Sequence, residues 1–307
     1  MMRSRNQLID LEILNKKGLK LSIKREDEIH PFISGNKYRK LKYNLIRAKE
    51  QGFTTLLSFG GAYSNHISAF SYAGKIAGFK TIGIIRGEEL GQDIAQTFRT
   101  NPTLKFAHDN GMRFKFISRE AYRRKEEPHF IEGLRAEFGN FYQIPEGGTN
   151  ELAIKGCEEI LTSRDDKFDY ICVSIGTGGT ISGLINTASA RQTVLGFPSL
   201  KGAFLDELIK EKTIDKSNWK LMHQYHFGGY AKINEILISF INDFNQQTTI
   251  PLDPIYTGKM MFGIMDLVHK DFFKRNSSIL AIHTGGLQGI EGMNQHLIRK
   301  KLPLINV

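Results

Sequence analysis

The chain has 307 residues, a mass of 34.8 kDa, and 42 lysines and arginines against 32 aspartates and glutamates, which gives a formal net charge of +10. Its length suggests roughly two domains of about 150 residues each, and its 40% hydrophobic and 24% charged residues exclude disordered and collagen-like chains. No apolar run reaches the roughly 18 residues that span a bilayer, and the charges scattered over residues 1–24 argue against a signal peptide. We therefore expect a soluble, cytoplasmic protein with no membrane partner.

The positive charge and the pI near 9.4 raise nucleic acid as a partner. The basic residues are dispersed, however, and acidic ones interrupt them, as where Glu26-Asp27 follow Lys24-Arg25. We therefore expect no nucleic-acid partner and interpret the charge as a solvated surface that helps to attract an anionic substrate. Cys157 and Cys172 form no CxxC pair and no Cys/His cluster at metal-ligand spacing, so we expect two reduced packing residues and no metal.

Short apolar runs alternate with amphipathic stretches along most of the chain. The runs that predict strands are residues 54–59, 81–86, 114–118, 168–175, 193–197 and 278–283. The stretches that predict helices include residues 65–77, 129–138, 150–161, 232–244 and 259–272. Several of the runs lack the alternation of a one-sided strand, which is typical of strands buried on both faces. The pattern predicts an α/β fold of mostly parallel sheets covered by helices, with glycine pairs concentrated where strands end and ligands bind.

The strongest local signal lies at residues 173–183 (VSIGTGGTISG), where an apolar strand runs through a glycine-rich loop into a helix. Such a loop presents backbone N–H groups and a helix N-terminus to a phosphate. The spacing matches neither a Walker loop nor the dinucleotide fingerprint. A tight turn with packing glycines is the alternative, and we favour the phosphate site.

Two further segments carry candidate site residues. In residues 58–66 (SFGGAYSNH), Ser64 and Asn65 stand at a predicted helix start, where they suit a carboxylate, although Ser64 also suits a plain helix cap. In residues 34–42 (SGNKYRKLK), Lys37 stands near a second helix start. A reactive lysine needs desolvation or a cationic neighbour to lower its pKa, and most lysines are simply solvated.

Together and in this order, the segments resemble the pyridoxal-phosphate enzymes of the tryptophan-synthase-β class (fold type II), and within it the 1-aminocyclopropane-1-carboxylate deaminase and D-cysteine desulfhydrase family. The matching segments are residues 23–27, 35–41, 64–66, 176–180, 256–259 and 283–286. The resemblance implies pyridoxal 5'-phosphate as cofactor, a small amino acid as substrate and a homodimer. It also implies two open, twisted, mostly parallel sheets flanked by helices. We expect a large cofactor-binding domain of residues 1–43 and 144–307 and a small inserted α/β domain of residues 44–143.

The resemblance also implies roles for single residues. Lys37 matches the lysine that forms the Schiff base with the cofactor and moves the substrate α-proton. The residues that match contacts to the cofactor are Gly176, Thr177, Gly178, Gly179 and Thr180 for its phosphate, Asn65 for its 3-hydroxyl and Thr284 near its pyridine nitrogen. The residues that match the substrate site are Ser64, Asn65 and His66. Tyr230 and Tyr256 match the two active-site tyrosines, and each could equally be a core residue.

Two positions favour one branch of the family. Deaminases that open the cyclopropane ring typically show Ser-Asn-Gln and Tyr-Glu-Gly-Lys, whereas residues 64–66 are Ser-Asn-His and residues 256–259 are Tyr-Thr-Gly-Lys. We therefore expect a lyase that converts D-cysteine to pyruvate, ammonia and hydrogen sulfide. The alternatives are deamination of 1-aminocyclopropane-1-carboxylate to 2-oxobutanoate and ammonia, another amino-acid lyase of the same fold, and a non-catalytic binder of pyridoxal phosphate or another phosphorylated ligand.

Overall fold

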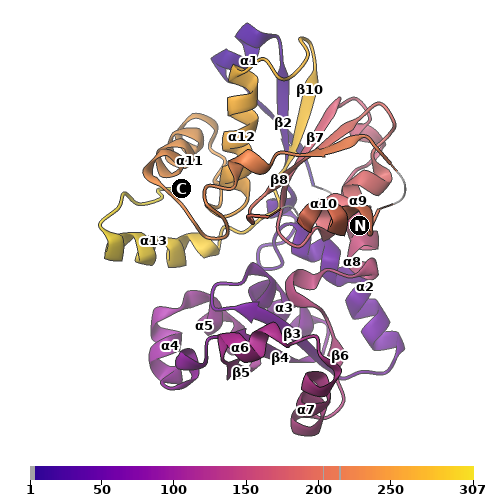
Figure 1. Cartoon of the computed structure of the whole chain (residues 1–307), viewed down its shortest axis with the longest axis vertical. Coiled ribbons are helices and arrows are strands. Elements are labelled where there is room, and N and C mark those ends of the chain that lie inside the picture. The colour runs from indigo at the N-terminus through magenta and orange to yellow at the C-terminus, as the bar shows by residue number, and fades with distance from the viewer. Residues whose placement is uncertain (1–3, 203, 214–215) are drawn as a thin grey trace.

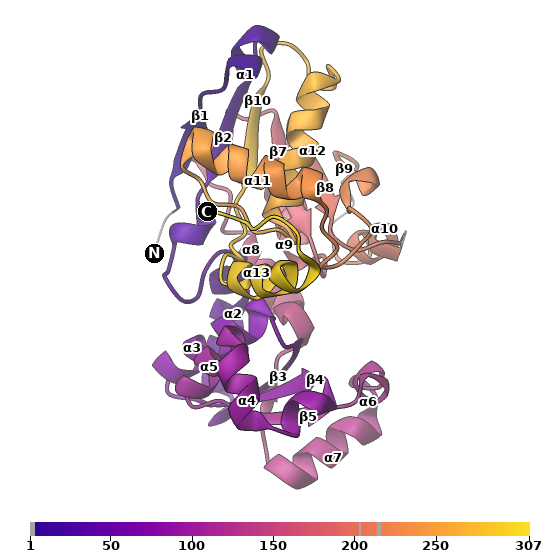
Figure 2. The ribbon, with the colours of Figure 1, turned by 90° about the vertical axis from the view of Figure 1, so that its left-hand side faces the viewer.

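The computed structural model describes residues 4–202, 204–213 and 216–307. It contains two sheets that lie one above the other along the long axis of the molecule (Figures 1 and 2). The strands of the larger sheet are, in spatial order, β1 (Asn6–Ile9), β2 (Lys20–Lys24), β10 (Ser278–Ile282), β7 (Tyr170–Ile175), β8 (Thr193–Pro198) and β9 (Trp219–Leu221). Those of the smaller sheet are β5 (Arg113–Ile117), β4 (Lys80–Arg86), β3 (Thr55–Gly61) and β6 (Tyr142–Gln143).

All neighbouring strands pair in parallel except β1 and β2, which are antiparallel. The predicted α/β class with mostly parallel sheets is therefore confirmed. In each sheet, the carboxyl ends of the parallel strands meet at one edge, which is where ligands bind in this class of fold.

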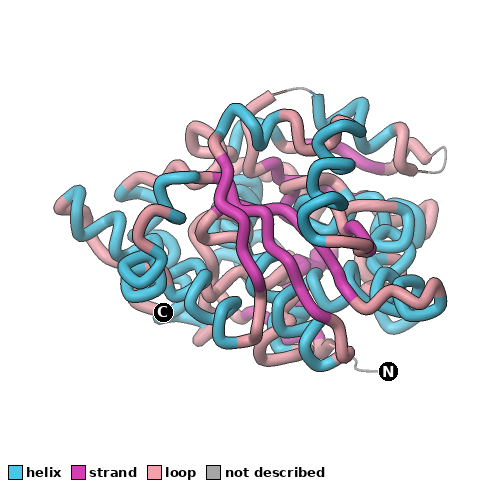
Figure 3. Tube along the Cα trace, turned by 90° about the horizontal axis from the view of Figure 1, so that it is seen from below, coloured by secondary structure: helices cyan, strands magenta, loops and turns pink. Residues whose placement is uncertain are grey.

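Helices surround the strands, which lie inside when the molecule is seen along its long axis (Figure 3). The helices packed around the larger sheet are α1 (Glu12–Lys17), α8 (Glu151–Cys157), α9 (Gly179–Thr187), α10 (Phe204–Lys210), α11 (Glu235–Thr248), α12 (Thr257–His269) and α13 (Gly289–Lys300). Those around the smaller sheet are α3 (Asn65–Ile76), α4 (Ile94–Thr100), α5 (Pro102–Asp109), α6 (Arg119–Arg123) and α7 (Pro128–Phe138). Short 3-10 helices are η1 (Glu26–Glu28), η2 (Glu88–Gly91), η3 (Glu146–Gly148), η4 (Ser163–Asp165) and η5 (His223–Tyr225).

Each sheet is buried on both faces. In β7, Ile171 and Val173 pack into one apolar core while Cys172 packs into another, on the opposite side of the sheet. In β3, Leu56 and Leu57 divide between two cores in the same way. Because successive side chains of a strand point to opposite faces, this division explains the unbroken apolar runs in the sequence.

Helix α2 (Asn36–Glu50) connects the two sheets and is held closely at its first turns. Gly35, its N-cap, has φ +63°, and a Cβ there would lie 1.9 Å from the Thr284 carbonyl oxygen. One turn later, Arg39 forms two hydrogen bonds of 2.9 and 3.0 Å to the buried carboxylate of Glu26. On the other side, a Cβ on Gly156 of α8 would lie 2.0 Å from the Arg39 carbonyl oxygen. Only glycine permits these backbone contacts.

The six strands predicted from the sequence are present as β3, β4, β5, β7, β8 and β10. The pattern missed the short strands β1, β2, β6 and β9. The strands of the smaller sheet fall between residues 55 and 143, and α2 runs through the predicted boundary at residue 44, so the domain limits stay a proposal. In the described part of the chain, no helix combines the length and hydropathy that crossing a membrane requires.

We predict that Gly156→Ala destabilises the protein, because the added methyl group would push α2 away from α8. The expected loss in the free energy of unfolding is about 1–3 kcal/mol, measured by urea denaturation. Gly133→Ala in α7 is the matched control, since a Cβ there meets nothing within 4 Å. It should stabilise the protein by about 0.5–1 kcal/mol through helix propensity. Equal effects of the two substitutions would contradict this account of the packing.

Candidate active site

The structure brings the predicted residues of the larger sheet together at the carboxyl ends of β7 and β10. The Thr284 hydroxyl, after β10, lies 3.0 Å from the hydroxyl of Ser174 in β7. Asn36 donates a hydrogen bond of 2.8 Å from Nδ2 to Thr180 Oγ1 at the start of α9. Its backbone N–H donates to the Thr284 carbonyl at 3.2 Å. The first turn of α2, the glycine loop after β7 and Thr284 therefore form one contiguous site.

Lys37 stands in this first turn with an amine suited to nucleophilic chemistry. Its Nζ donates to Asn36 Oδ1 at 2.9 Å, and no carboxylate in the described parts of the chain forms an ion pair with it. Desolvation, followed by the positive charge of Lys40, lowers the pKa of Lys37 to about 7. A large fraction of the amine is therefore neutral near pH 7. Lys37 has both a desolvated amine and a cationic neighbour, and either one lowers the pKa of a reactive lysine.

Lys40 is a site residue to which the sequence analysis gave no role. Its ammonium is buried and donates to Thr149 Oγ1 at 2.9 Å, to the Gly147 carbonyl at 3.1 Å and to Thr177 Oγ1 at 3.3 Å. All three acceptors are neutral, so the charge is uncompensated among the described residues, and burial lowers the pKa of Lys40. The available signal was its spacing, because residues i and i+3 lie on the same face of a helix.

The glycine loop has the geometry of an anion site. Gly178 adopts φ +83° as the N-cap of α9, and the first hydrogen bond inside the helix runs from Ser182 N to the Gly178 carbonyl at 3.0 Å. The N–H groups of residues 179–181 precede that bond and are therefore left for an external partner. A Cβ on Gly179 would lie 3.4 Å from Lys40 Cε, so the buried ammonium lies directly beside the loop. Helix N-terminus and cation together favour a phosphate.

At the turn after β3, Ser64 caps α3 by accepting a hydrogen bond of 3.3 Å from the Ile67 N–H. The side chain of Asn65, partly exposed, has no hydrogen-bond partner among the described residues. A cation also lies here, since a Cβ on Gly61 would be 3.6 Å from a guanidinium nitrogen of Arg86, at the end of β4. The capping interpretation of Ser64 is thus confirmed, and the turn keeps the charge and free polar groups that a carboxylate site needs.

His66 lies behind this turn, in the protein interior. Its Nε2 is 2.7 Å from Ser58 Oγ, and Ser58 in turn donates to the Ile144 carbonyl at 2.8 Å. Because the Ser58 hydroxyl donates its proton to that carbonyl, it can only accept from His66, so we assign the ring proton of His66 to Nε2. The Nδ1 lone pair, buried and without a partner in the described structure, faces Gly148. Desolvation first, then Lys37 and Lys40, lower the pKa of His66 well below its usual value, which keeps the ring neutral.

The two predicted tyrosines lie side by side. The rings of Tyr230 and Tyr256 are 6.3 Å apart and roughly perpendicular, and the Tyr256 ring lies against Gly176, where a Cβ would be 3.2 Å from Cε1. Burial, followed by Tyr230, raises the pKa of Tyr256 well above its usual value, so its hydroxyl stays protonated. Tyr230, by contrast, is 43% exposed, so it is a rim residue and not a core residue.

Two residues of the segment 256–259 hold the backbone around these tyrosines. The buried ammonium of Lys259 donates to the carbonyls of His226 and Gly229 at 3.0 and 2.8 Å, which fixes the loop that carries Tyr230. The Thr257 hydroxyl is fully buried and lies 2.7 Å from Asp253 Oδ1, so it stabilises the start of α12. Thr257, which the sequence analysis used to choose a branch of the family, is therefore directed at Asp253 and away from solvent.

We predict that Lys40→Gln raises the pKa of Lys37 above about 7, because it removes the neighbouring positive charge that opposes protonation. The measurement is an NMR titration of the ¹³C-methylated, cofactor-free protein, with the Lys37 signal assigned from a Lys37→Arg variant. Lys42→Gln is the control, since Lys42 bonds to Glu159 at 2.6 Å and does not contribute to the Lys37 shift. An unchanged Lys37 pKa in Lys40→Gln would refute the proposed coupling.

Known proteins resemble this chain over most of its length. Residues 2–285 match the family described as pyridoxal-phosphate dependent enzyme. The chain is 30% identical to the bifunctional D-cysteine desulfhydrase/1-aminocyclopropane-1-carboxylate deaminase of Arabidopsis thaliana, over 89% of this chain and 74% of that protein. It is 26% identical to a D-cysteine desulfhydrase of Serratia proteamaculans, over 88% and 87%. The crystal structure of an ACC deaminase homologue superimposes with a TM-score of 0.81 at 30% identity, covering 97% of this chain and 93% of that one.

A threonine deaminase of Solanum lycopersicum, at 18% identity and a TM-score of 0.63, shares the fold alone. These matches confirm the expected fold type II and the expected cofactor. The chain belongs to the pyridoxal-phosphate dependent enzymes and, within them, to the family of 1-aminocyclopropane-1-carboxylate deaminases and D-cysteine desulfhydrases, which act on small amino acids.

Proposed function

We propose that the protein is a lyase that converts D-cysteine and water to pyruvate, ammonia and hydrogen sulfide. The observation that carries a cofactor-dependent reaction is the pair of lysines at the glycine loop. Lys37 offers a neutral amine, and Lys40 offers a buried charge with no carboxylate partner among the described residues. A non-catalytic phosphate binder would need Lys40 and the loop but would have no use for a lysine with a lowered pKa.

The charge and the polar groups of the site residues fit pyridoxal phosphate. An uncompensated buried ammonium beside an open helix N-terminus requires an anion, and the cofactor phosphate supplies it. Lys37 stands two residues from Gly35, whose contact with Thr284 brings the amine to the end of β10. Thr284, whose hydroxyl lies 3.0 Å from that of Ser174, would supply a neutral hydroxyl to the pyridine nitrogen, and Asn65 would supply an amide to the 3-hydroxyl.

When bound, the cofactor withdraws electrons from the substrate α-carbon. The residues of this chain then have separate tasks. The N-terminus of α3, with Ser64 and Asn65 and the nearby guanidinium of Arg86, binds and orients the substrate carboxylate. The neutral amine of Lys37 takes the α-proton. Tyr256 holds its own proton and, with Tyr230, covers the reacting atoms from water. His66, buried behind the turn, is hydrogen-bonded to Ser58, and its lowered pKa keeps the ring neutral.

Deamination of 1-aminocyclopropane-1-carboxylate is the second candidate, because the Arabidopsis relative is named for both activities. The two reactions share the α-amino acid head and the cofactor, and they differ in the groups needed beside the β-carbon. His66 and Thr257 favour the desulfhydrase. Both side chains, however, are buried and hydrogen-bonded to other residues, so their influence on the substrate is indirect. The homodimer and the cytoplasmic location also stay predictions.

Lys37→Ala should abolish turnover and covalent attachment of the cofactor, because it removes the amine while leaving the phosphate site intact. Attachment is measured by borohydride reduction followed by peptide mass spectrometry, and turnover by pyruvate release. Lys49→Ala, an exposed lysine near the end of the same helix, should behave as the wild type. A Lys37→Ala protein that turns over at the wild-type rate would refute the assignment.

A substrate panel separates the candidate reactions. We expect D-cysteine to yield pyruvate and sulfide in equal amounts, with a kcat/KM above those for L-cysteine, D-serine and 1-aminocyclopropane-1-carboxylate. Release of 2-oxobutanoate from the cyclopropane acid as the fastest reaction would replace the proposed function with the second candidate. Covalent cofactor loading without turnover of any of the four would contradict both.

A further inference from the structure

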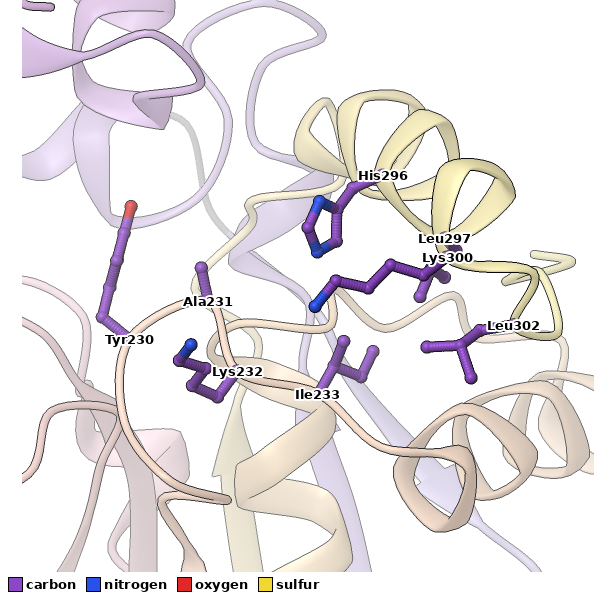
Figure 4. A pocket seen from close by; sticks show the side chains of 8 residues that line it. All are labelled: Tyr230, Ala231, Lys232, Ile233, His296, Leu297, Lys300 and Leu302. Atoms are coloured by element: carbon purple, nitrogen blue, oxygen red, sulfur yellow. The ribbon is translucent and has the colours of Figure 1, made fainter.

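A cavity of about 200 Å³ lies between the segment that follows Tyr230 and helix α13 (Figure 4). The residues that line it are Tyr230, Ala231, Lys232, Ile233, His296, Leu297, Lys300 and Leu302. Tyr230 stands at its edge, and its hydroxyl points away from His296 and Lys300 (Figure 4). The cavity shares no lining residue with the glycine loop, the first turn of α2 or the Ser64 turn, and Tyr230 is the one residue that it has in common with the site described above.

Apart from Tyr230 at the edge, the polar side chains that line this cavity are cationic or become so on protonation. Lys232, His296 and Lys300 reach it from two segments far apart in the sequence, and no acidic residue lines it. All three side chains are exposed to solvent at the mouth of the cavity, and none forms an ion pair or a side-chain hydrogen bond with another described residue, so they are free to contact an anion. Burial, followed by Lys300, Arg299 and Lys232, lowers the pKa of His296, as expected where like charges gather.

The rest of the lining is apolar, which narrows the class of ligand. Ile233, Leu297 and Leu302 form an aliphatic wall beside the cationic groups, as Figure 4 shows. An inorganic anion would leave this wall without contacts, whereas an organic anion uses both parts. Sites for drug-sized ligands have volumes of about 300–1,000 Å³. The volume of this cavity is smaller, so the ligand is small. We propose that this cavity binds a short aliphatic carboxylate, with its carboxylate among Lys232, His296 and Lys300 and its hydrocarbon tail against the aliphatic wall.

The cavity also adjoins the segment that carries Tyr230. Ala231 adopts φ +55°, a strained conformation for a residue with a side chain, and Lys232 N donates to the Gly229 carbonyl at 3.2 Å. A carboxylate held by Lys232 would therefore bind beside the segment that carries Tyr230, whose ring is 6.3 Å from that of Tyr256.

Isothermal titration calorimetry of the cofactor-loaded protein with butyrate tests the proposal, with butyramide as the uncharged ligand of matched shape. We expect binding of butyrate and none of butyramide. Lys232→Gln/Lys300→Gln should weaken butyrate binding by about tenfold or more, since it removes two charge-assisted contacts. Lys20→Gln/Lys49→Gln removes the same charge from exposed positions outside the cavity and should leave binding unchanged.

Ser64→Ala separates this cavity from the carboxylate site proposed for the substrate. Butyrate binding that survives Ser64→Ala and is lost in Lys232→Gln/Lys300→Gln supports the proposal whether or not the protein turns over D-cysteine. Binding that is lost in Ser64→Ala and survives in the double lysine variant would assign butyrate to the catalytic site alone and overturn it. Absence of butyrate binding to the wild type, or equally tight binding of inorganic phosphate, would overturn it as well.

Discussion

The contact between Gly35 and the Thr284 carbonyl fixes where the two site lysines of α2 lie relative to the larger sheet. It brings the start of α2 against the end of β10, and no side chain fits between them. The buried pair of Arg39 and Glu26 then prevents the helix from turning about that contact, because both partners are hydrogen-bonded twice. A buried pair of this kind contributes more to a unique geometry than to stability. These two contacts determine where Lys37 and Lys40 lie.

The electrostatics of the site follow from that geometry. A single helix face carries both lysines, with Lys40 buried and Lys37 partly exposed, and neither has a carboxylate partner in the described structure. Each ammonium makes the protonation of the other less favourable, and the outcome differs between them. Lys40 donates hydrogen bonds to two hydroxyl oxygens and one carbonyl oxygen, whereas Lys37 donates only to the Asn36 amide oxygen. The same segment therefore supplies one fixed cation for binding and one free amine for chemistry.

Local signals in the sequence predicted much of this architecture. The apolar run into the glycine loop predicted β7 and α9, since both the strand and the turn are encoded in consecutive residues. The role of Lys40 was not predictable in this way, because Gly147 and Thr149 are more than a hundred residues away in the chain. Strands β6 and β9, with two and three residues, are too short to produce a pattern. Thr257 and His66 were visible as departures from a motif, but only the structure shows that both face inward.

The lowered pKa of Lys37 also makes the stability of the folded chain depend on pH and on bound anions. Lys37 has a lower pKa in the folded state, about 7, than the ordinary value of 10.5 that it takes when unfolded. Between these values the unfolded chain holds more protons, so the stability of the cofactor-free protein rises with pH across that interval and is least where the amine is charged in both states. An anion that binds only the folded state offsets this cost by mass action. Loading with the cofactor therefore stabilises the fold as well as completing the site, and the cofactor-free chain is the form that unfolds more readily.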